Sequence, residues 1–339
     1  MFLIKRHIVI PVFVPHKGCP FDCVFCNQKV ISGQLADATE AEIRKTIEEH
    51  LETSGDAFVE IGFYGGSFTG IEKEEQEWYL KIGYSYVREG KVDQIRLSTR
   101  PDYINEDILD LLAAYGVKTI ELGAQSLDAD VLSCSNRGHS IEAVSEAARL
   151  IKEKGFSLGI QTMIGLPEDT REKAVLTAER VVGMAPDIVR IYPTLVVKDT
   201  YLQKMYKAGK YKPLSVEEAV DISAELLQIY EDNNIKVIRI GLQPTDNISE
   251  KGEVEAGPFH PAFRQLVQSR LVLKKMIKEI EDKNFTGSSD IIIECNPKES
   301  SNVVGQKKEN IIKLKSLFNF RSIKVKIDAG TEAINIIKA

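Results

Sequence analysis

The segment Gly18-Cys19-Pro20-Phe21-Asp22-Cys23-Val24-Phe25-Cys26-Asn27 holds three cysteines within eight residues, in the spacing CxxxCxxC. Three thiolates on one short loop can converge on a soft metal or on an iron–sulfur cluster. Because such a cluster takes up to four thiolates, three cysteines leave one iron open to another ligand. The loop therefore predicts a metal centre held by Cys19, Cys23 and Cys26.

Two simpler interpretations of this loop remain open. A structural zinc site is closed by four ligands, and the chain has no second CxxC or HxxxH pair, although His16 could be a fourth ligand. A disulfide would leave one cysteine over and would need an oxidising compartment. The two further cysteines, Cys134 and Cys295, are too scattered to indicate a disulfide framework, so we expect ordinary thiols there.

Segments typical of β-strands alternate with segments typical of helices through most of the chain. The expected strands are 6–14, 57–64, 94–98, 117–122, 156–164 and 187–192, with one more at 235–240 beside them. Polar N-caps mark several of the intervening helices, at Thr39, Asn105, Ser140 and Ser215. Successive strand–helix units predict parallel strands with right-handed crossovers, closed or partly closed as a barrel. Function should then lie at the carboxyl ends of the strands, where the cysteine loop follows the first strand.

Composition is that of an ordinary globular protein, with 43% hydrophobic and 28% charged residues in 339. The net charge of −6 argues against a protein whose main function is to bind polyanions, but not against a local basic patch. We find no apolar run of membrane-spanning length and no leader, so we expect a cytoplasmic protein without a membrane partner.

The character of the sequence changes near residue 260. We expect a barrel with a post-barrel extension over residues 1–260 and a small α+β appendage over residues 261–339. The appendage should contain a long Lys-rich helix, a helix near 308–317 and strands at 291–295 and 322–327. It is too small for an acetyltransferase domain.

The cysteine spacing, with the aromatic Phe25 directly before the last cysteine, resembles the signature of the radical S-adenosylmethionine (SAM) superfamily. The resemblance implies a six-unit partial (β/α) barrel, a 4Fe-4S cluster on the three cysteines, and SAM bound at the open iron. An external one-electron donor such as flavodoxin or ferredoxin would reduce the cluster. Cleavage of SAM would give a 5′-deoxyadenosyl radical that takes a hydrogen atom from the substrate.

Residues after the later strands resemble the SAM-binding positions of that family. Gly65 and Gly66 after the second strand match its glycine motif, because glycine lets the backbone approach a ligand closely. The full set implied by the resemblance is Phe25, Gly65, Gly66, Ser67, Thr99, Arg100, Gln125, Arg137, Gln161, Met163 and Leu166. Coproporphyrinogen dehydrogenases carry a ribose-binding Asp where this chain has Gln161, and an amide can still hydrogen-bond a hydroxyl.

Over about residues 6–265 the chain resembles enzymes related to the catalytic subunit of Elongator. Elongator subunits have a longer cysteine spacing and a C-terminal acetyltransferase, so carboxymethylation of wobble uridine does not carry over. Among short-form relatives, queuine lyase provides the first hypothesis: a carbon–nitrogen lyase that releases 7-aminomethyl-7-deazaguanine in queuine salvage. The alternatives are a tRNA-modifying radical enzyme and a non-catalytic iron–sulfur or zinc protein. Sequence leaves the oligomeric state open.

A queuine-like deazapurine requires a carboxylate that accepts hydrogen bonds from its guanine-like edge. Glu60 and Glu121 on the second and fourth strands are our candidate catalytic residues, although they could simply face a helix layer. The candidate substrate contacts are Tyr64, Tyr192, Gln243, Asn247 and His260. A tRNA substrate could bind a basic face on the appendage, although such a run of charges is more often only a solvated surface. The residues of this face are Lys307, Lys308, Lys313, Lys315, Arg321, Lys324 and Lys326.

Overall fold

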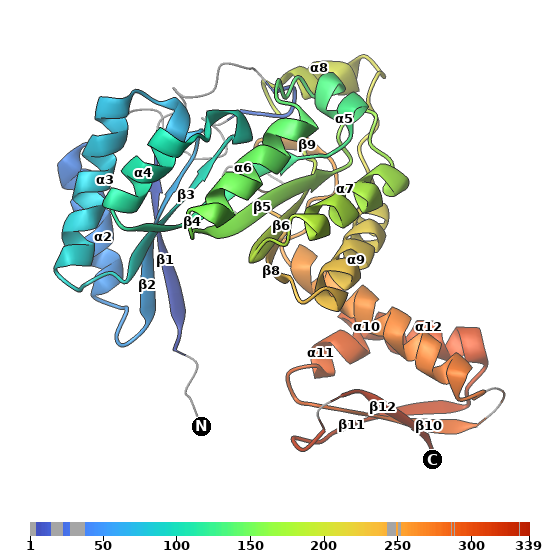
Figure 1. Ribbon diagram of the computed structural model, residues 1–339. Helices are drawn as coiled ribbons and strands as arrows, with labels where there is room; N and C mark the ends of the chain where they lie inside the picture. Colours follow the sequence, from blue (N-terminus) through green and yellow to red (C-terminus); the bar gives the residue numbers. More distant parts are fainter. Residues whose placement is uncertain are drawn as a thin grey trace.

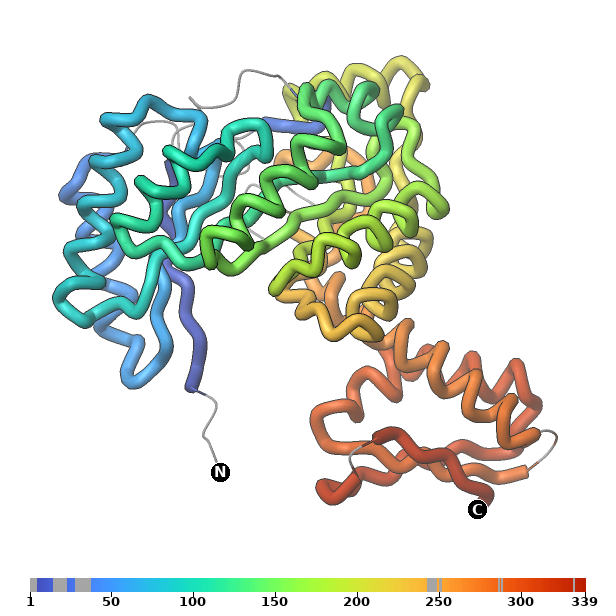
Figure 2. The backbone as a smooth tube through the Cα atoms, in the orientation of Figure 1, coloured from blue at the N-terminus to red at the C-terminus, as the bar shows by residue number. Residues whose placement is uncertain are grey.

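The computed structural model describes residues 5–14, 23–27, 38–242, 249, 252–285, 287, 289–331 and 333–339. Within these residues, a curled parallel sheet lies behind a layer of helices, and a smaller unit at the C-terminal end stands apart from it (Figure 1). Figure 2 follows the chain from the barrel into this smaller unit through a single helix, α10 (Phe263–Asp282).

Seven strands form the main sheet, in the order β1-β2-β3-β4-β5-β6-β8, and every neighbouring pair is parallel. Their bounds are β1 (His7–Phe13), β2 (Phe58–Tyr64), β3 (Gln94–Thr99), β4 (Val117–Gln125), β5 (Ser157–Ile164), β6 (Ile188–Pro193) and β8 (Lys236–Ile240). The predicted partial (β/α) barrel with a small α+β appendage is confirmed. The strand expected beside the six units is β8, which extends the same sheet by pairing with β6.

Helices between the strands cover one face of the sheet (Figure 1). They are α2 (Glu40–Leu51), α3 (Lys73–Arg88), α4 (Glu106–Ala114), α6 (Ile141–Glu153), α7 (Arg171–Gly183) and α9 (Val216–Asp232). Two short helices, α5 (Ala129–Cys134) and α8 (Tyr201–Lys207), contribute no residue to the apolar core beneath these helices, and α8 packs against Val24 through Leu202. The capping boxes at Thr39 and Ser215 are both formed, and Asn105 and Ser140 cap α4 and α6. Sequence patterns do not predict α5, α7 or α8.

Side chains alternate between the two faces of each strand, and the two faces differ in chemistry. On β2 and β3, Val59, Ile61, Ile95 and Leu97 are buried in the core beneath the helices. Residues at the intervening positions, such as Glu60 and Arg96, lie on the opposite, concave face, which we call the inner face. Burial of the aliphatic face stabilises the barrel, and the inner face is left for function.

The C-terminal unit has its own sheet, in the order β11-β10-β12, and its own apolar core. Its elements after α10 are β10 (Asp290–Cys295), α11 (Ser300–Val304), α12 (Glu309–Phe318), β11 (Ser322–Ile327) and β12 (Asn335–Lys338). Sequence patterns do not predict α11 or β12. The first part of α10 packs in the barrel core through Phe263 and Val267, and its last part packs in the small core through Met276 and Ile280. One helix therefore belongs to both cores, and the division at residue 260 stays an expectation.

A two-stranded antiparallel ribbon, β7 (Val196–Val197) with β9 (Val254–Ala256), follows the sixth strand. No helix in the described ranges is long and apolar enough to cross a membrane.

Candidate active site

The cysteine loop is described at Cys23 and Cys26, whereas Cys19 lies outside the described residues. The backbone N–H of Val24 donates to Ser135 O (3.1 Å), and its carbonyl accepts from the N–H of Leu202 (2.7 Å). The loop is therefore held between the end of α5 and the start of α8. Cys23 is buried, and its carbonyl accepts from the N–H of Cys26 (3.0 Å), so both thiols belong to one turn.

Arg137 joins this turn to the end of β4. Its Nη1 donates to the Cys23 Sγ across 3.4 Å, its Nη2 donates to Gly123 O, and its Nε donates to the His139 Nε2 at 3.2 Å. The last contact requires an unprotonated Nε2, which leaves the ring proton on Nδ1 facing Ser140 O (3.3 Å). Burial, with help from the charge of Arg137, lowers the pKa of His139 to about 4, so the ring is neutral near pH 7.

The ends of β2 and β3 are tied together by buried hydroxyl groups. Thr99 Oγ1 contacts Ser67 Oγ at 2.9 Å and Thr69 Oγ1 at 2.6 Å. The backbone N–H of Arg100 donates to Ser67 Oγ (3.2 Å), and its guanidinium binds Asp102 through two contacts of 2.9 Å. Three predicted SAM contacts, Ser67, Thr99 and Arg100, are thus joined by hydrogen bonds at the carboxyl edge of the sheet.

Gly65, which directly follows β2, occupies a position that requires glycine. Gly65 has φ +114°, and a Cβ there would lie 2.7 Å from Val14 O at the end of β1. No side chain fits such a gap without moving backbone, so β1 and β2 meet here through main-chain atoms. For Gly66, the predicted approach to a ligand stays a prediction.

Gln125, at the end of β4, has the left-handed φ of +67° and a buried amide oxygen. Within the described residues this oxygen accepts no hydrogen bond. An unsatisfied buried acceptor costs about 1–3 kcal/mol, which a ligand with a hydroxyl or amino donor would recover. Gln125 is thus the predicted SAM contact that most directly indicates a missing ligand.

The end of β5 is fixed by Asp169 and Tyr211, which sequence patterns did not single out. Gly165 has φ +74°, its N–H donates to the Asp169 carboxylate (2.7 Å), and its carbonyl accepts from the Tyr211 hydroxyl. Asp169 follows Gly165-Leu166-Pro167 by two residues, and such a carboxylate close after a glycine turn could have indicated this contact. Leu166 is buried, and Met163 pairs in register with Tyr192 of β6, so SAM contacts by either stay predictions.

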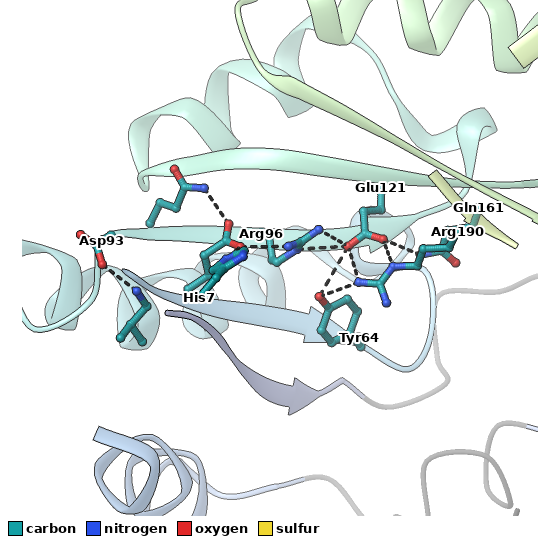
Figure 3. Close-up of polar contacts among 10 residues, drawn as sticks. His7, Tyr64, Asp93, Arg96, Glu121, Gln161 and Arg190 are labelled. Carbon is teal, nitrogen blue, oxygen red and sulfur yellow. Dashed lines mark hydrogen bonds and ion pairs between the residues drawn. The ribbon is translucent and has the colours of Figure 1, made fainter. Parts of the chain in front are cut away.

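A row of charged side chains crosses the inner face from β1 to β6 (Figure 3). Glu60 accepts from His7 (2.5 Å), Gln94 (2.6 Å) and Arg96 (2.9 Å). Arg96 continues to Glu121 at 2.7 and 3.1 Å, and Glu121 also binds the guanidinium of Arg190. We call Glu60, Arg96, Glu121 and Arg190 the ionic row.

Both carboxylates of the ionic row are only 1% exposed, and both oxygens of each accept hydrogen bonds from neighbouring side chains. Glu121 accepts from Arg96 and Arg190, and in addition from Gln161 Nε2 (3.2 Å) and the Tyr64 hydroxyl (3.5 Å). Burial alone would raise the pKa of Glu121, but Arg190 and Arg96 outweigh it, so the pKa lies below its usual value. Binding a base edge, the role predicted for both carboxylates, would require Arg96 or Arg190 to release an oxygen of Glu121, whereas Glu60 Oε1 accepts one hydrogen bond within the described residues, from Gln94. Gln161 binds Glu121 only through Nε2, so its amide oxygen could still accept from a ribose hydroxyl, and that contact stays a prediction.

Sequence patterns located the two carboxylates but missed Arg96 and Arg190. Arg96 and Arg190 alternate with aliphatic residues along β3 and β6, and this alternation could have placed both side chains on the inner face. Tyr64 lies in the same layer, with its ring 5.6 Å from the Arg190 Cζ. Burial raises the pKa of both Tyr64 and Tyr192, which keeps these hydroxyls protonated.

Three other predicted substrate contacts were named from the sequence: Gln243, Asn247 and His260. Gln243 and Asn247 are outside the described residues. His260 Nδ1 accepts from the N–H of Ala262 (3.1 Å), and its carbonyl accepts from Phe263, so His260 shapes the start of α10. Contact between His260 and a substrate stays a prediction.

A curled parallel sheet with a cysteine loop after its first strand and ligand-binding positions at the following strand ends is the architecture of radical SAM enzymes. The chain belongs to this superfamily: residues 13–181 match the radical SAM superfamily and residues 186–272 match the radical SAM C-terminal domain.

Relatives within the superfamily are Elongator-like. A tRNA uridine(34) acetyltransferase of Methanocaldococcus infernus is 30% identical over 187 residues, which cover 48% of this chain and 34% of that protein. An uncharacterized protein of Methanocaldococcus jannaschii is 27% identical over 223 residues, covering 64% of this chain and 65% of the relative. The structure of the M. infernus Elp3 with an N-terminal deletion shares the fold, with a TM-score of 0.63, 24% identity, and coverage of 83% and 64%. The chain thus spans about a third of the acetyltransferase that it matches.

Radical SAM enzymes use a 4Fe-4S cluster and SAM, which confirms the two predicted cofactors. The described residues fit them: Cys23 and Cys26 share one turn, and Gln125 has a buried amide oxygen that accepts no hydrogen bond within the described residues. When bound, these groups supply a radical that abstracts hydrogen from the substrate.

Proposed function

We propose that the radical chemistry of this enzyme acts on a nucleotide of tRNA. The ionic row carries the proposal, because it lines the inner face with fixed hydrogen-bond donors beside two tyrosine rings. Tyr64 and Tyr192 can pack against a planar base, and the donors of Arg190 suit the carbonyl or phosphate oxygens of a nucleotide.

The relatives support the same substrate class. The matched archaeal enzyme is named for tRNA uridine 34. Acetyl transfer is not part of the proposal, because the chain spans only 34% of that relative.

Queuine lyase is the more specific hypothesis from the sequence, and the ionic row is less favourable to it. A deazaguanine edge presents N–H donors and needs an acceptor, whereas Glu60 and Glu121 already accept from His7, Gln94, Arg96, Arg190 and Gln161. A free base that used Glu121 as its acceptor would have to displace Arg96 or Arg190 from a buried carboxylate, which costs several kcal/mol.

The chain's own residues would orient the substrate rather than exchange protons with it. Arg96 is fixed between two carboxylates and Arg190 is held by Glu121, so their remaining donors point in set directions. Such preorganisation holds one C–H near the abstracting atom while limiting the entry of water.

The test is anaerobic reconstitution with iron, sulfide, dithionite and SAM, comparing bulk tRNA with queuine. We expect tRNA to increase the formation of 5′-deoxyadenosine, and deuterated tRNA to transfer label into it. If queuine alone stimulates cleavage and yields 7-aminomethyl-7-deazaguanine, the lyase hypothesis replaces this proposal. A Cys23→Ala protein serves as the control for cleavage without the cluster.

A further inference from the structure

The short helix α8 lies in a segment, residues 198–212, that contacts the cysteine turn. The N–H of Leu202 donates to Val24 O (2.7 Å), and the Asn27 Nδ2 donates to Lys198 O (3.1 Å). Leu202 is fully buried and packs against Val24. Two hydrogen bonds and one buried contact therefore fix the start of α8 next to the positions that hold the cluster.

The other end of this segment is anchored at a second part of the candidate active site. The Tyr211 hydroxyl donates to Gly165 O, directly after β5, and the Tyr211 side chain packs in the same small apolar cluster as Val24 and Leu202. Because the segment is held at both ends, side chains on its outer surface project from a fixed backbone.

Two tyrosines of α8 are exposed to solvent. Tyr201 is 61% exposed and Tyr206 is 36% exposed. Every other phenylalanine, tyrosine and tryptophan among the described residues is buried or half-buried. Contact with a partner would remove this aromatic surface from water, which is favourable. Both exposed rings lie on one helix of seven residues beside the candidate active site, which indicates a binding surface.

Lysines accompany these rings. Segment 198–212 contains five lysines and one acidic residue, Asp199. Three of the lysines lie near a carboxylate from another part of the chain, in the pairs Lys198–Glu253, Lys207–Glu255 and Lys212–Glu218. Lys204 and Lys210 are exposed and form no ion pair within the ranges that the structure describes. The positive charge is therefore partly balanced, so the two rings must supply most of the binding free energy of an anionic partner.

Lys204 is well placed to act together with a ring. It follows Tyr201 by three positions on α8, so the two side chains are neighbours on one face of the helix. An aromatic ring beside an ammonium group suits a nucleotide, because the ring can stack on the base while the ammonium contacts the phosphate. Bases inside a duplex are already stacked and paired, so such a ring favours unpaired bases.

We propose that the outer face of α8 binds unpaired nucleotides of the RNA substrate. Their bases stack on Tyr201 and Tyr206, and their phosphates contact Lys204 and Lys210. The identity of this RNA as the substrate rests on the proposed function. Because α8 contacts the cysteine turn, a strand bound here lies next to the candidate active site. A free base such as queuine has no phosphate for the lysines.

The binding test uses the full chain with its cluster reconstituted and a labelled short oligouridylate, followed by fluorescence anisotropy. We expect the single strand to bind at least about tenfold more tightly than duplex RNA of the same length. Tyr201→Ser and Tyr206→Ser should each weaken binding of the single strand at least about fivefold, whereas Tyr201→Phe keeps the ring and should retain the parent affinity. Lys204→Gln should reduce the slope of log affinity against log salt by about 0.7.

Two control variants remove exposed side chains outside this surface. They are Leu176→Ser on α7, which is 38% exposed, and Lys278→Gln on α10, and neither should change the binding of the oligouridylate. Circular dichroism and iron content establish that each variant is folded and retains its cluster.

Equal binding of single strand and duplex, or parent affinity in the folded Tyr201→Ser and Tyr206→Ser proteins, would overturn the stacking surface. A loss in Tyr201→Phe as large as in Tyr201→Ser would also overturn it, since the ring would then not be the binding group. If the surface fails while tRNA still stimulates SAM cleavage, only the docking inference is wrong. If the oligouridylate binds as expected but tRNA never stimulates cleavage, the bound RNA is not the substrate and that assignment is overturned.

Discussion

Arg137 and Cys23 are 114 residues apart in the sequence, yet the Arg137 Nη1 donates to the Cys23 sulfur across 3.4 Å. Hydrogen bonds and positive charge at a ligand sulfur stabilise the reduced form of an iron–sulfur cluster and so help to set its reduction potential. The contacts of Arg137 with Gly123 O and with the neutral ring of His139 fix the guanidinium in this position.

Arg137→Gln should therefore lower the midpoint potential of the reconstituted cluster by tens of millivolts. The variant loses both the charge and the donor facing the sulfur. Redox titration followed by electron paramagnetic resonance, without SAM present, measures this directly. Arg137→Lys keeps the charge and should show a smaller shift; an unchanged potential in both variants would contradict the role of the contact.

We predict that the cysteines separate into cluster ligands and ordinary thiols. Cys19→Ala, Cys23→Ala and Cys26→Ala should each abolish cluster-dependent cleavage of SAM. Cys134 is exposed, and Cys134→Ala should leave both iron content and cleavage unchanged. Iron analysis and product chromatography on the four proteins decide the assignment, and parent-level cleavage by Cys23→Ala would refute it.

The ionic row should stabilise the folded protein, in addition to its proposed role in orienting the substrate. Glu121→Gln leaves Arg96 and Arg190 buried without their shared carboxylate, and breaking such a pair costs about 3–5 kcal/mol. Urea denaturation of the variant, with exposed Glu146→Gln as the control, measures the loss. The control should change by less than about 0.5 kcal/mol. A similarly small loss for Glu121→Gln would mean that the buried charges are not coupled.

Local patterns predicted the seven strands of the main sheet and several of the helices, because their causes lie within a few residues, but they did not predict α5, α7, α8, α11 or β12. The capping boxes at Thr39 and Ser215 form as the sequence indicates, and strands such as β11 match their predicted bounds. The short ribbon of β7 and β9 was not predicted, since two- and three-residue strands carry no periodicity.

The candidate site was less predictable, because its contacts join distant strands. Glu121 could be placed on the fourth strand, but its pairing with Arg96 and Arg190 depends on which positions face each other across the barrel. The same limit applies to Arg264 of α10, which meets β8 only in the folded chain. Motif resemblance supplied the predicted SAM-binding positions, since the spacing of single polar residues does not indicate a ligand.

Asp169 provides a prediction about pH. Burial raises the pKa of Asp169 from the ordinary 3.8 to about 6, although backbone N–H groups of Gly165 and Thr170 oppose the shift. Between pH 3.8 and about 6 the folded chain therefore binds more protons at this carboxyl than the unfolded chain does. The contribution of Asp169 to stability accordingly falls as the pH rises through this window and stays low above about pH 6.

Asp169→Asn keeps an oxygen for the N–H of Gly165 but cannot ionise. We expect the variant to be more stable than the parent at pH 7, by on the order of 1 kcal/mol, and the difference to shrink as the pH falls toward 4. Urea denaturation of both proteins from pH 4 to pH 7 measures it, and subtracting the two curves removes the contribution of other titrating groups. A constant difference across this range would show that the carboxyl of Asp169 ionises alike in the folded and unfolded chains. A variant less stable at pH 7 than at pH 4, relative to the parent, would mean that the ionised carboxylate stabilises the Gly165 turn.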